Sequence, residues 1–159
     1  MPDFTHIDSE GRVRMVDVSE KPPTLRTALA TGAIFMKPAT LDLIVHQAVK
    51  KGNVLETARI AGVMAAKRTA DMIPMCHPLN ITHVQIDFFP DQKKSSICIE
   101  AIVRIVHQTG VEMEALSAVA VAALTIYDMC KSYDREMTIS DIRLLKKSGG
   151  KSGTFVRTS

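Results

Sequence analysis

Tryptophan is absent from this sequence, and aromatic residues make up only 4% of its 159 residues. Proteins that hold single-stranded nucleic acid usually stack the bases on aromatic side chains, so this class of function is disfavoured. The formal net charge of +3 is also too small for a dedicated nucleic-acid surface, although it allows local basic patches. The sequence therefore predicts no nucleic-acid partner.

Cysteine, long apolar runs and metal-binding motifs are scarce as well. Three widely spaced cysteines are an odd number, which argues against a disulfide framework and favours a reducing cytoplasm. Neither CxxC nor HExxH occurs, so we expect no resident metal. The longest apolar run, residues 118–124, is shorter than the ~20 residues of a membrane helix. The first residues lack the basic start and apolar segment of a secretory signal.

The composition that remains is ordinary for a globular protein, with 46% hydrophobic and 23% charged residues. This length suits one domain. We therefore expect a single domain over residues 1–159, with a flexible N-terminal segment (about 1–12) and a Gly/Lys-rich C-terminal tail (about 147–159).

Three helices are predicted by apolar periodicity and capping residues. The first begins at Thr40 as N-cap and extends to about residue 50. The second covers 53–72, with Asn53 as N-cap and Glu56 as its capping-box partner. The third covers about 112–133 and is apolar on almost every side, which predicts burial almost all round.

The strands follow from alternation and from runs of Ile and Val. Residues 84–88, 97–106 and 137–145 are predicted as strands, and 13–18 and 28–36 are weaker candidates. Hairpins with separate helices favour an α+β fold, with a mainly antiparallel sheet and helices on one side. The order in the later part of the chain is that of a split βαβ, ferredoxin-like unit.

The few polar residues of the third helix fall within an arc of about 120°. They are Glu114, Ser117, Thr125, Asp128, Lys131 and Ser132. Asp128 and Lys131 are three residues apart and can form an ion pair, either on the surface or as an acid/base pair in a cavity. The remaining apolar surface of this helix predicts a symmetric partner and active sites built from two subunits.

Two further segments carry candidate binding residues. Pro74 and Pro78 enclose Met75, Cys76 and His77 in a stiff loop, which is either structural or a ligand-binding loop. The tail from Lys146 to Gly153 fails the P-loop pattern, but its glycines and lysines suit either a basic end or an adaptable phosphate cradle.

Several long stretches, taken together and in order, resemble the cyclic pyranopterin monophosphate synthase family of molybdenum-cofactor biosynthesis. These stretches are residues 15–19, 51–69, 73–79, 109–116, 124–131 and 147–153. Met75 stands where this family is expected to have Leu, which conserves volume. Pro22-Pro23 makes an early loop stiffer than expected.

The resemblance implies a ferredoxin-like α+β enzyme that forms hexamers as trimers of dimers. The implied reaction converts 3′,8-cyclo-7,8-dihydroguanosine 5′-triphosphate to cyclic pyranopterin monophosphate and pyrophosphate, which is a lyase reaction. It implies no resident cofactor and leaves open whether Mg²⁺ accompanies the triphosphate. A non-catalytic, oligomeric nucleotide-binding protein is the alternative.

The resemblance also implies roles for individual residues. Asp128 and Lys131 become the catalytic pair. The substrate base would contact Met75, Cys76, His77, Glu112, Met113 and Glu114. The phosphates would face the Gly-rich tail and Lys51, Lys67 and Lys147.

Overall fold

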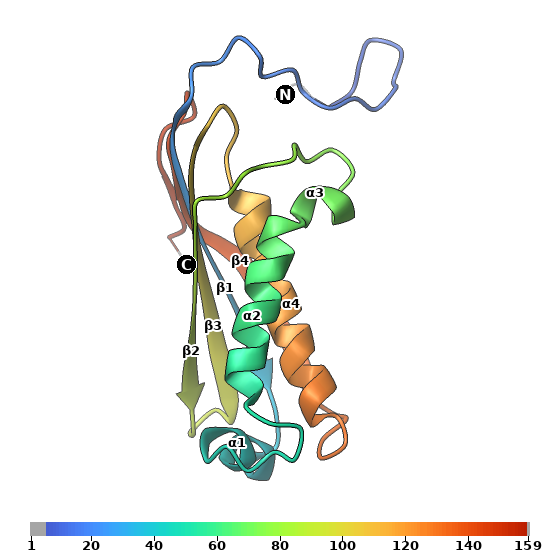
Figure 1. Ribbon diagram of the computed structural model, residues 1–159, viewed down its shortest axis with the longest axis vertical. Coiled ribbons are helices and arrows are strands. Elements are labelled where there is room, and N and C mark those ends of the chain that lie inside the picture. Colours follow the sequence, from blue (N-terminus) through green and yellow to red (C-terminus); the bar gives the residue numbers. More distant parts are fainter. Residues whose placement is uncertain (1–5, 159) are drawn as a thin grey trace.

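The computed structural model describes residues 6–158, which form one antiparallel sheet with two long helices on one face (Figure 1). The sheet order is β2-β3-β1-β4-β5. In chain order the elements are β1 (Thr24–Phe35), α1 (Pro38–Val45), α2 (Val54–Lys67), α3 (Thr69–Met72), β2 (His83–Asp91), β3 (Ser96–His107), α4 (Glu112–Cys130), β4 (Thr138–Ser148) and β5 (Phe155–Val156).

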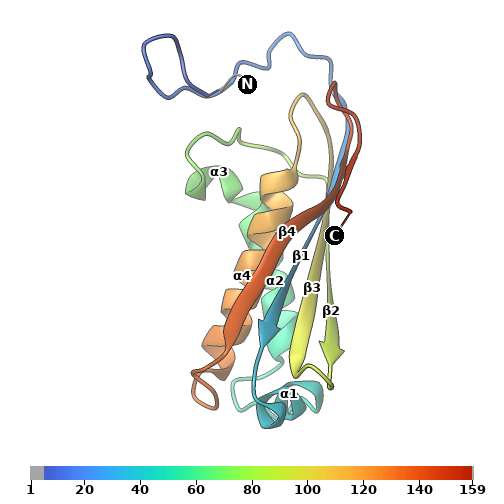
Figure 2. The ribbon, with the colours of Figure 1, turned by 180° about the vertical axis from the view of Figure 1, so that it is seen from behind.

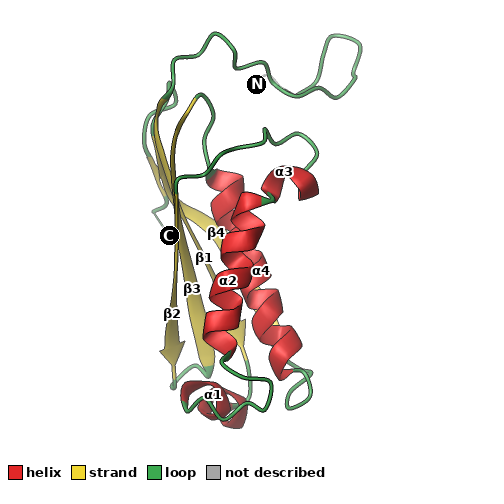
Figure 3. Cartoon of the chain, viewed as in Figure 1, coloured by secondary structure: helices red, strands yellow, loops and turns green. Residues whose placement is uncertain are grey.

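The helices α2 and α4 cover the same face of the sheet, and the opposite face carries no helix among the described residues (Figures 2 and 3). The order β1-α2-β2-β3-α4-β4, with β1 and β3 central, is the ferredoxin-like arrangement. The predicted α+β fold with helices on one side is confirmed.

Strand β1 lies at the centre of the sheet, between β3 and β4, although its sequence predicted only a weak strand. Its small residues explain both facts. Ala28 and Ala30 are fully buried, and a Cβ added to Gly32 would lie 2.7 Å from Cγ1 of Val119 on α4. Small residues have low strand propensity, but they let α4 approach the sheet closely.

Helices α2 and α4 pack through small residues in the same way. A Cβ added to Gly62 would collide with Cδ1 of Ile86 and lie 3.0 Å from the carbonyl oxygen of Ala118. Ala115 and Ala122 of α4 are fully buried. This close approach is the reason for a glycine inside α2, where it costs about 1 kcal/mol of helix propensity.

The ends of the helices differ from the predictions. α1 begins at Pro38 with Lys37 as N-cap, and Thr40 lies buried in the first turn. It ends at Val45 because Gln47 takes a left-handed conformation (φ 53°).

The second and third helices are shorter than predicted. α2 ends at Lys67, where Arg68 (φ −115°) separates it from the short α3. Asn53 does cap α2, its Oδ1 accepting from the Glu56 N–H at 3.2 Å, whereas the Glu56 side chain contacts Arg59. α4 ends at Cys130.

The segment 13–18 is not a strand, apart from an isolated bridge between Ile7 and Val13. The Val16 carbonyl contacts His77 of the 75–79 loop, and the Val18 carbonyl accepts from the Lys21 N–H. Residues 1–5 of the expected flexible N-terminal segment, and residue 159 of the tail, lie outside the described residues. The rest of the tail folds back, because β5 pairs with β4.

In the described residues α4 alone has the length and composition of a candidate membrane span. Half of that window is buried inside the protein, and α4 packs on the sheet and on α2. This packing identifies it as the core helix. It is not buried all round, however, since Leu124 is 56% exposed and Met113 is 37% exposed.

Candidate functional site

Two adjoining pockets lie at the N-terminus of α4. The first also borders the start of β1 and the end of β4, and the second borders the N-terminal segment and the 75–79 loop. The first has a volume of about 550 Å³ and the second about 430 Å³. They share Lys21, Thr109, Gly110 and Glu112 in their walls. One ligand could therefore extend from one pocket into the other.

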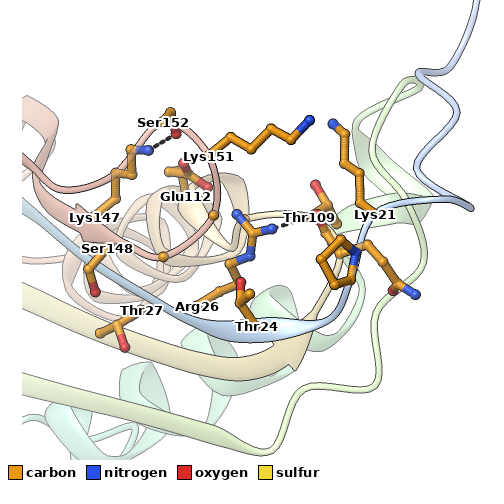
Figure 4. A pocket seen from close by; sticks show the side chains of 15 residues that line it. Lys21, Thr24, Arg26, Thr27, Thr109, Glu112, Lys147, Ser148, Lys151 and Ser152 are labelled. Carbon is orange, nitrogen blue, oxygen red and sulfur yellow. Dashed lines mark hydrogen bonds between the residues drawn. The ribbon is translucent and has the colours of Figure 1, made fainter.

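The first pocket is cationic (Figure 4). Lys21, Arg26, Lys147 and Lys151 line it, and the Lys21 and Lys151 side chains point toward each other across it. The Lys147 ammonium donates to the Ser152 hydroxyl. Four cations against the single carboxylate of Glu112 make this cavity suited to an anion.

Arg26 also holds the wall between the two pockets. Its Nε donates to the His107 carbonyl (3.1 Å) and its Nη2 donates to the Gln108 carbonyl (2.8 Å). The tail packs against it, because a Cβ on Gly150 would overlap the Arg26 guanidinium and a Cβ on Gly149 would overlap the Leu25 carbonyl. Both glycines have positive φ, so they are needed for the turn as well as for the contact.

Thr24 adds a polar atom to this pocket. Its Oγ1 is buried and has no hydrogen-bond partner among the described residues. Buried hydroxyl groups are normally paired, so an unpaired one beside an anion site fits a place that a ligand or water completes.

The second pocket brings together all the residues that the resemblance assigned to the base. Met75, Cys76, His77, Glu112, Met113 and Glu114 line it, together with part of the N-terminal segment. Residues 75–77 belong to the loop that follows α3, and residues 112–114 form the first turn of α4. Residues far apart in the chain thus meet here as expected.

His77 is held by the N-terminal segment. Its Nε2 lies 2.7 Å from the Val16 carbonyl oxygen, and because a carbonyl only accepts, Nε2 carries the proton. The opposite ring nitrogen, Nδ1, then has a free lone pair in the neutral imidazole. The contact therefore fixes both the ring orientation and its tautomer.

Glu114 is the acidic residue of this pocket whose pKa is shifted. It is 3% exposed, and burial raises its pKa to about 7, with the nearby Glu112 charge adding to the rise. Burial and then Glu114 raise the pKa of the Cys76 thiol. Near pH 7 the pocket can thus hold or release a proton at Glu114.

The predicted catalytic pair lies elsewhere. Lys131 Nζ donates to Asp128 Oδ1 at 2.7 Å, and Lys51 Nζ donates to the Asp128 carbonyl at 3.0 Å. The hydrogen bond and charge of Lys131, followed by the charge of Lys51, hold the Asp128 pKa below its usual value. The side chains of Lys131 and Asp128 are 52% and 63% exposed, so this pair lies on the surface of the single chain.

The helix α4 separates this pair from the pockets. Glu112 and Asp128 are at opposite ends of it, which corresponds to about 24 Å at 1.5 Å per residue. Lys51 lies with the pair, Lys147 lies in the first pocket, and Lys67 lines neither pocket. Within one chain the predicted site residues therefore form two groups.

Two cationic pocket residues, Lys21 and Arg26, were absent from the predicted site. Lys21 precedes Pro22-Pro23 in what reads as a loop, and Arg26 lies just before the weak strand candidate 28–36. The run of small residues that follows Arg26 hid the strand. A signal was present in the alternation of Leu25, Thr27 and Leu29.

Comparison with known proteins places the chain in a family. Residues 15–150 match the model of the MoaC family. The match covers the Asp128–Lys131 pair and both pockets except for His6, Lys151 and Ser152. The chain therefore belongs to the MoaC family.

Its relatives have a common name. The protein from Desulforapulum autotrophicum is 68% identical over 98% of this chain and 96% of its own length. Those from Desulfatibacillum aliphaticivorans and Thermoanaerobacter pseudethanolicus are 64% and 61% identical, over 98% and 97% of this chain and 98% of each relative. Each is named cyclic pyranopterin monophosphate synthase. The chain is thus a member of an enzyme family.

Proposed function

We propose that this chain is a cyclic pyranopterin monophosphate synthase of molybdenum-cofactor biosynthesis. Its substrate would be 3′,8-cyclo-7,8-dihydroguanosine 5′-triphosphate, and its products cyclic pyranopterin monophosphate and pyrophosphate. This makes it a phosphorus–oxygen lyase. The observation that carries the proposal is the pair of adjoining pockets, one cationic and one acidic, in a chain of this family.

The two pockets match the two ends of such a substrate. The guanine-derived ring presents adjacent N–H donors. The carboxylates of Glu112 and Glu114 can accept paired hydrogen bonds from these donors. The triphosphate fits the pocket of Lys21, Arg26 and Lys147, whose charges also stabilise the departing pyrophosphate. Thr109 and Gly110 lie between the two ends.

The reaction opens and recloses rings before the cyclic phosphate forms, so proton transfer dominates its chemistry. Lys131 would act as the proton donor, and Asp128 would orient it or accept protons. The cationic Lys51 stands beside them. In the single chain, these groups are too far from the pockets to act on a ligand held there.

A second copy of the chain resolves that separation. The exposed apolar side chains Ile60, Met64 and Leu124 lie on α2 and α4, between the pockets and the catalytic pair. If this face packs against the same face of a partner with α4 reversed, each Asp128–Lys131 pair approaches the partner's pockets. We therefore propose active sites shared between two chains, in hexamers that are trimers of dimers.

No resident cofactor is part of the proposal. Among residues 6–158 there is no group of three or more His, Cys, Asp or Glu side chains that could hold a metal ion. The ring rearrangement needs no redox group, and Mg²⁺ would arrive with the triphosphate. Three free cysteines fit the proposed cytoplasmic location.

The first test is pyrophosphate release from the cyclised GTP derivative by the wild-type protein. The synthase should release one pyrophosphate per substrate and form cyclic pyranopterin monophosphate. A non-catalytic nucleotide-binding protein would bind the same substrate without turnover. Binding without product would therefore favour the alternative.

The second test concerns the shared site. Lys131→Ala and His77→Ala proteins, each inactive alone, are mixed, unfolded and refolded as mixed oligomers. Shared sites restore a fraction of the activity, because some sites then receive both wild-type residues. Mixed oligomers that contain both chains but stay inactive would assign the two residues to one chain's site.

A further inference from the structure

The loop between α1 and α2 carries Lys51, and its shape is fixed at several points. Val49 is 5% exposed and anchors the loop in the core. Gln47 and Gly52 both have positive φ (53° and 111°), so the chain turns sharply on each side of Val49. The backbone that carries Lys51 therefore has a defined turn conformation.

This turn is tied to the end of α4 by the next aromatic residue after that helix. The Lys50 backbone N–H donates to the Tyr133 hydroxyl at 3.2 Å. Lys51 itself donates through Nζ to the Asp128 carbonyl at 3.0 Å. One hydrogen bond thus fixes the backbone beside Lys51, and another fixes its ammonium group.

Asp134, the neighbour of Tyr133, is a buried carboxylate to which the proposed reaction assigns no role. It is 2% exposed and accepts from the N–H groups of Lys37 (2.8 Å) and Glu136 (3.0 Å). The Thr40 hydroxyl (3.5 Å) and the Lys37 ammonium (3.8 Å) approach it as well. Burial acts to raise the Asp134 pKa, but the two N–H hydrogen bonds, the Lys37 charge and the Thr40 hydrogen bond together outweigh burial and hold the pKa below its usual value.

Lys37 and Thr40 lie at the start of α1, and Lys50 lies beyond its end. Tyr133 and Asp134 are adjacent in sequence, so together they hold both ends of the segment 37–51 against the C-terminal end of α4. The same short turn follows directly on Asp128 and Lys131. The hydrogen bonds of Tyr133 and Asp134 thus connect the loop that carries Lys51 to the helix end that carries Asp128 and Lys131.

We propose that Tyr133 is a positioning residue for Lys51: by accepting from the Lys50 N–H, its hydroxyl fixes the backbone next to Lys51 relative to Asp128 and Lys131, and Asp134 anchors the turn that presents Tyr133. The proposal rests on the proposed function. A lysine has a long, flexible side chain, so the position of its backbone sets where its ammonium group can act. Small displacements of catalytic groups reduce rates strongly.

The test is Tyr133→Phe, which removes the hydroxyl and keeps the ring. Losing one such hydrogen bond should lower kcat for pyrophosphate release by about three- to ten-fold. The KM and the unfolding midpoint should change little, because neither the pockets nor the core is touched. The matched control is Tyr127→Phe: its hydroxyl donates to the Arg135 carbonyl (3.1 Å), on the same turn but not on the Lys51 loop. The control should retain wild-type kcat.

A second variant, Asp134→Asn, tests the anchor. An amide cannot reproduce all the acceptors of the carboxylate, so we expect both the unfolding midpoint and kcat to fall, with KM again nearly unchanged. Wild-type kcat in Tyr133→Phe, or equal losses in Tyr133→Phe and Tyr127→Phe, would overturn the inference. A wild-type protein that releases no pyrophosphate would instead overturn the proposed function, so the two failures are distinguishable.

Discussion

Burial of Glu114 in the second pocket predicts a stability that depends on pH in an unusual direction. Its pKa rises from 4.5 to about 7 on folding, so between these values the folded protein binds more protons than the unfolded chain. The contribution of Glu114 to the free energy of unfolding is therefore highest below about pH 4.5. It falls as the pH rises toward 7 and stays reduced above pH 7. A shift of this size corresponds to about 3 kcal/mol at 1.36 kcal/mol per pH unit.

The perturbation is Glu114→Gln, which keeps the shape and removes the titration. At pH 8 the variant should be more stable than the wild type by about 3 kcal/mol, and near pH 4 the two should differ little. The assay is urea unfolding from pH 4 to 8 at fixed protein concentration, because oligomers unfold in a concentration-dependent way.

The same substitution should lower catalytic turnover, because substitutions that stabilise a protein at its functional site commonly reduce its activity. A matched control is Glu112→Gln on the same helix turn, which removes a neighbouring charge and should stabilise the protein less. If the wild-type and Glu114→Gln stabilities run parallel from pH 4 to 8, the raised pKa is wrong. A variant less stable than the wild type at pH 8 would refute the reasoning outright.

Three further predictions concern the proposed catalytic pair, the tail and the helix packing. Lys131→Ala and Asp128→Asn should each lower pyrophosphate release by about 10²–10⁴-fold while substrate still binds; near-normal release would leave the pair as a surface salt bridge. Deleting residues 149–159 should weaken substrate binding at physiological salt by about ten-fold or more, with little change in the unfolding midpoint, since Lys146–Ser148 keep their pairing with β1. Unchanged affinity in a titration would assign the tail no part in binding. Gly62→Ala should destabilise the protein by about 1 kcal/mol in urea unfolding, because overpacking against Ala118 and Ile86 outweighs the gain in helix propensity.

Local signals predicted the elements that local forces dominate. The Asn53 cap, the alternation over 84–88 and the apolar run over 97–106 each correspond to observed features. The strand β1 was underestimated because its small residues serve the packing of α4, which is a tertiary demand that strand propensity does not express. The early end of α1 has the same origin, since the left-handed Gln47 turns Val49 into the core.

The site was predicted in part and by different kinds of signal. The residues 75–77 and 112–114 were assigned to one pocket only through the family resemblance, since nothing local shows that a proline-bounded loop meets the first turn of a distant helix. Arg26 was missed because its partners are backbone carbonyls of residues 107 and 108, which no side-chain motif reveals. Residue types alone do not indicate which side chains will bond to main-chain carbonyl groups.

The polar stripe on the third helix shows how a correct periodicity can still mislead about distance. Glu114 and Asp128 share a face of α4, but the helix rise separates them by about 21 Å, so one face holds two chemically different ends. The helix thereby sets the spacing between a pocket and the proposed catalytic pair. In the proposed two-fold arrangement each chain would give its pair to one site and its pockets to the other, so both sites would depend on the same length of α4. An insertion in this helix would therefore misplace the residues of both sites at once, which ties its unbroken 19-residue span to the proposed function.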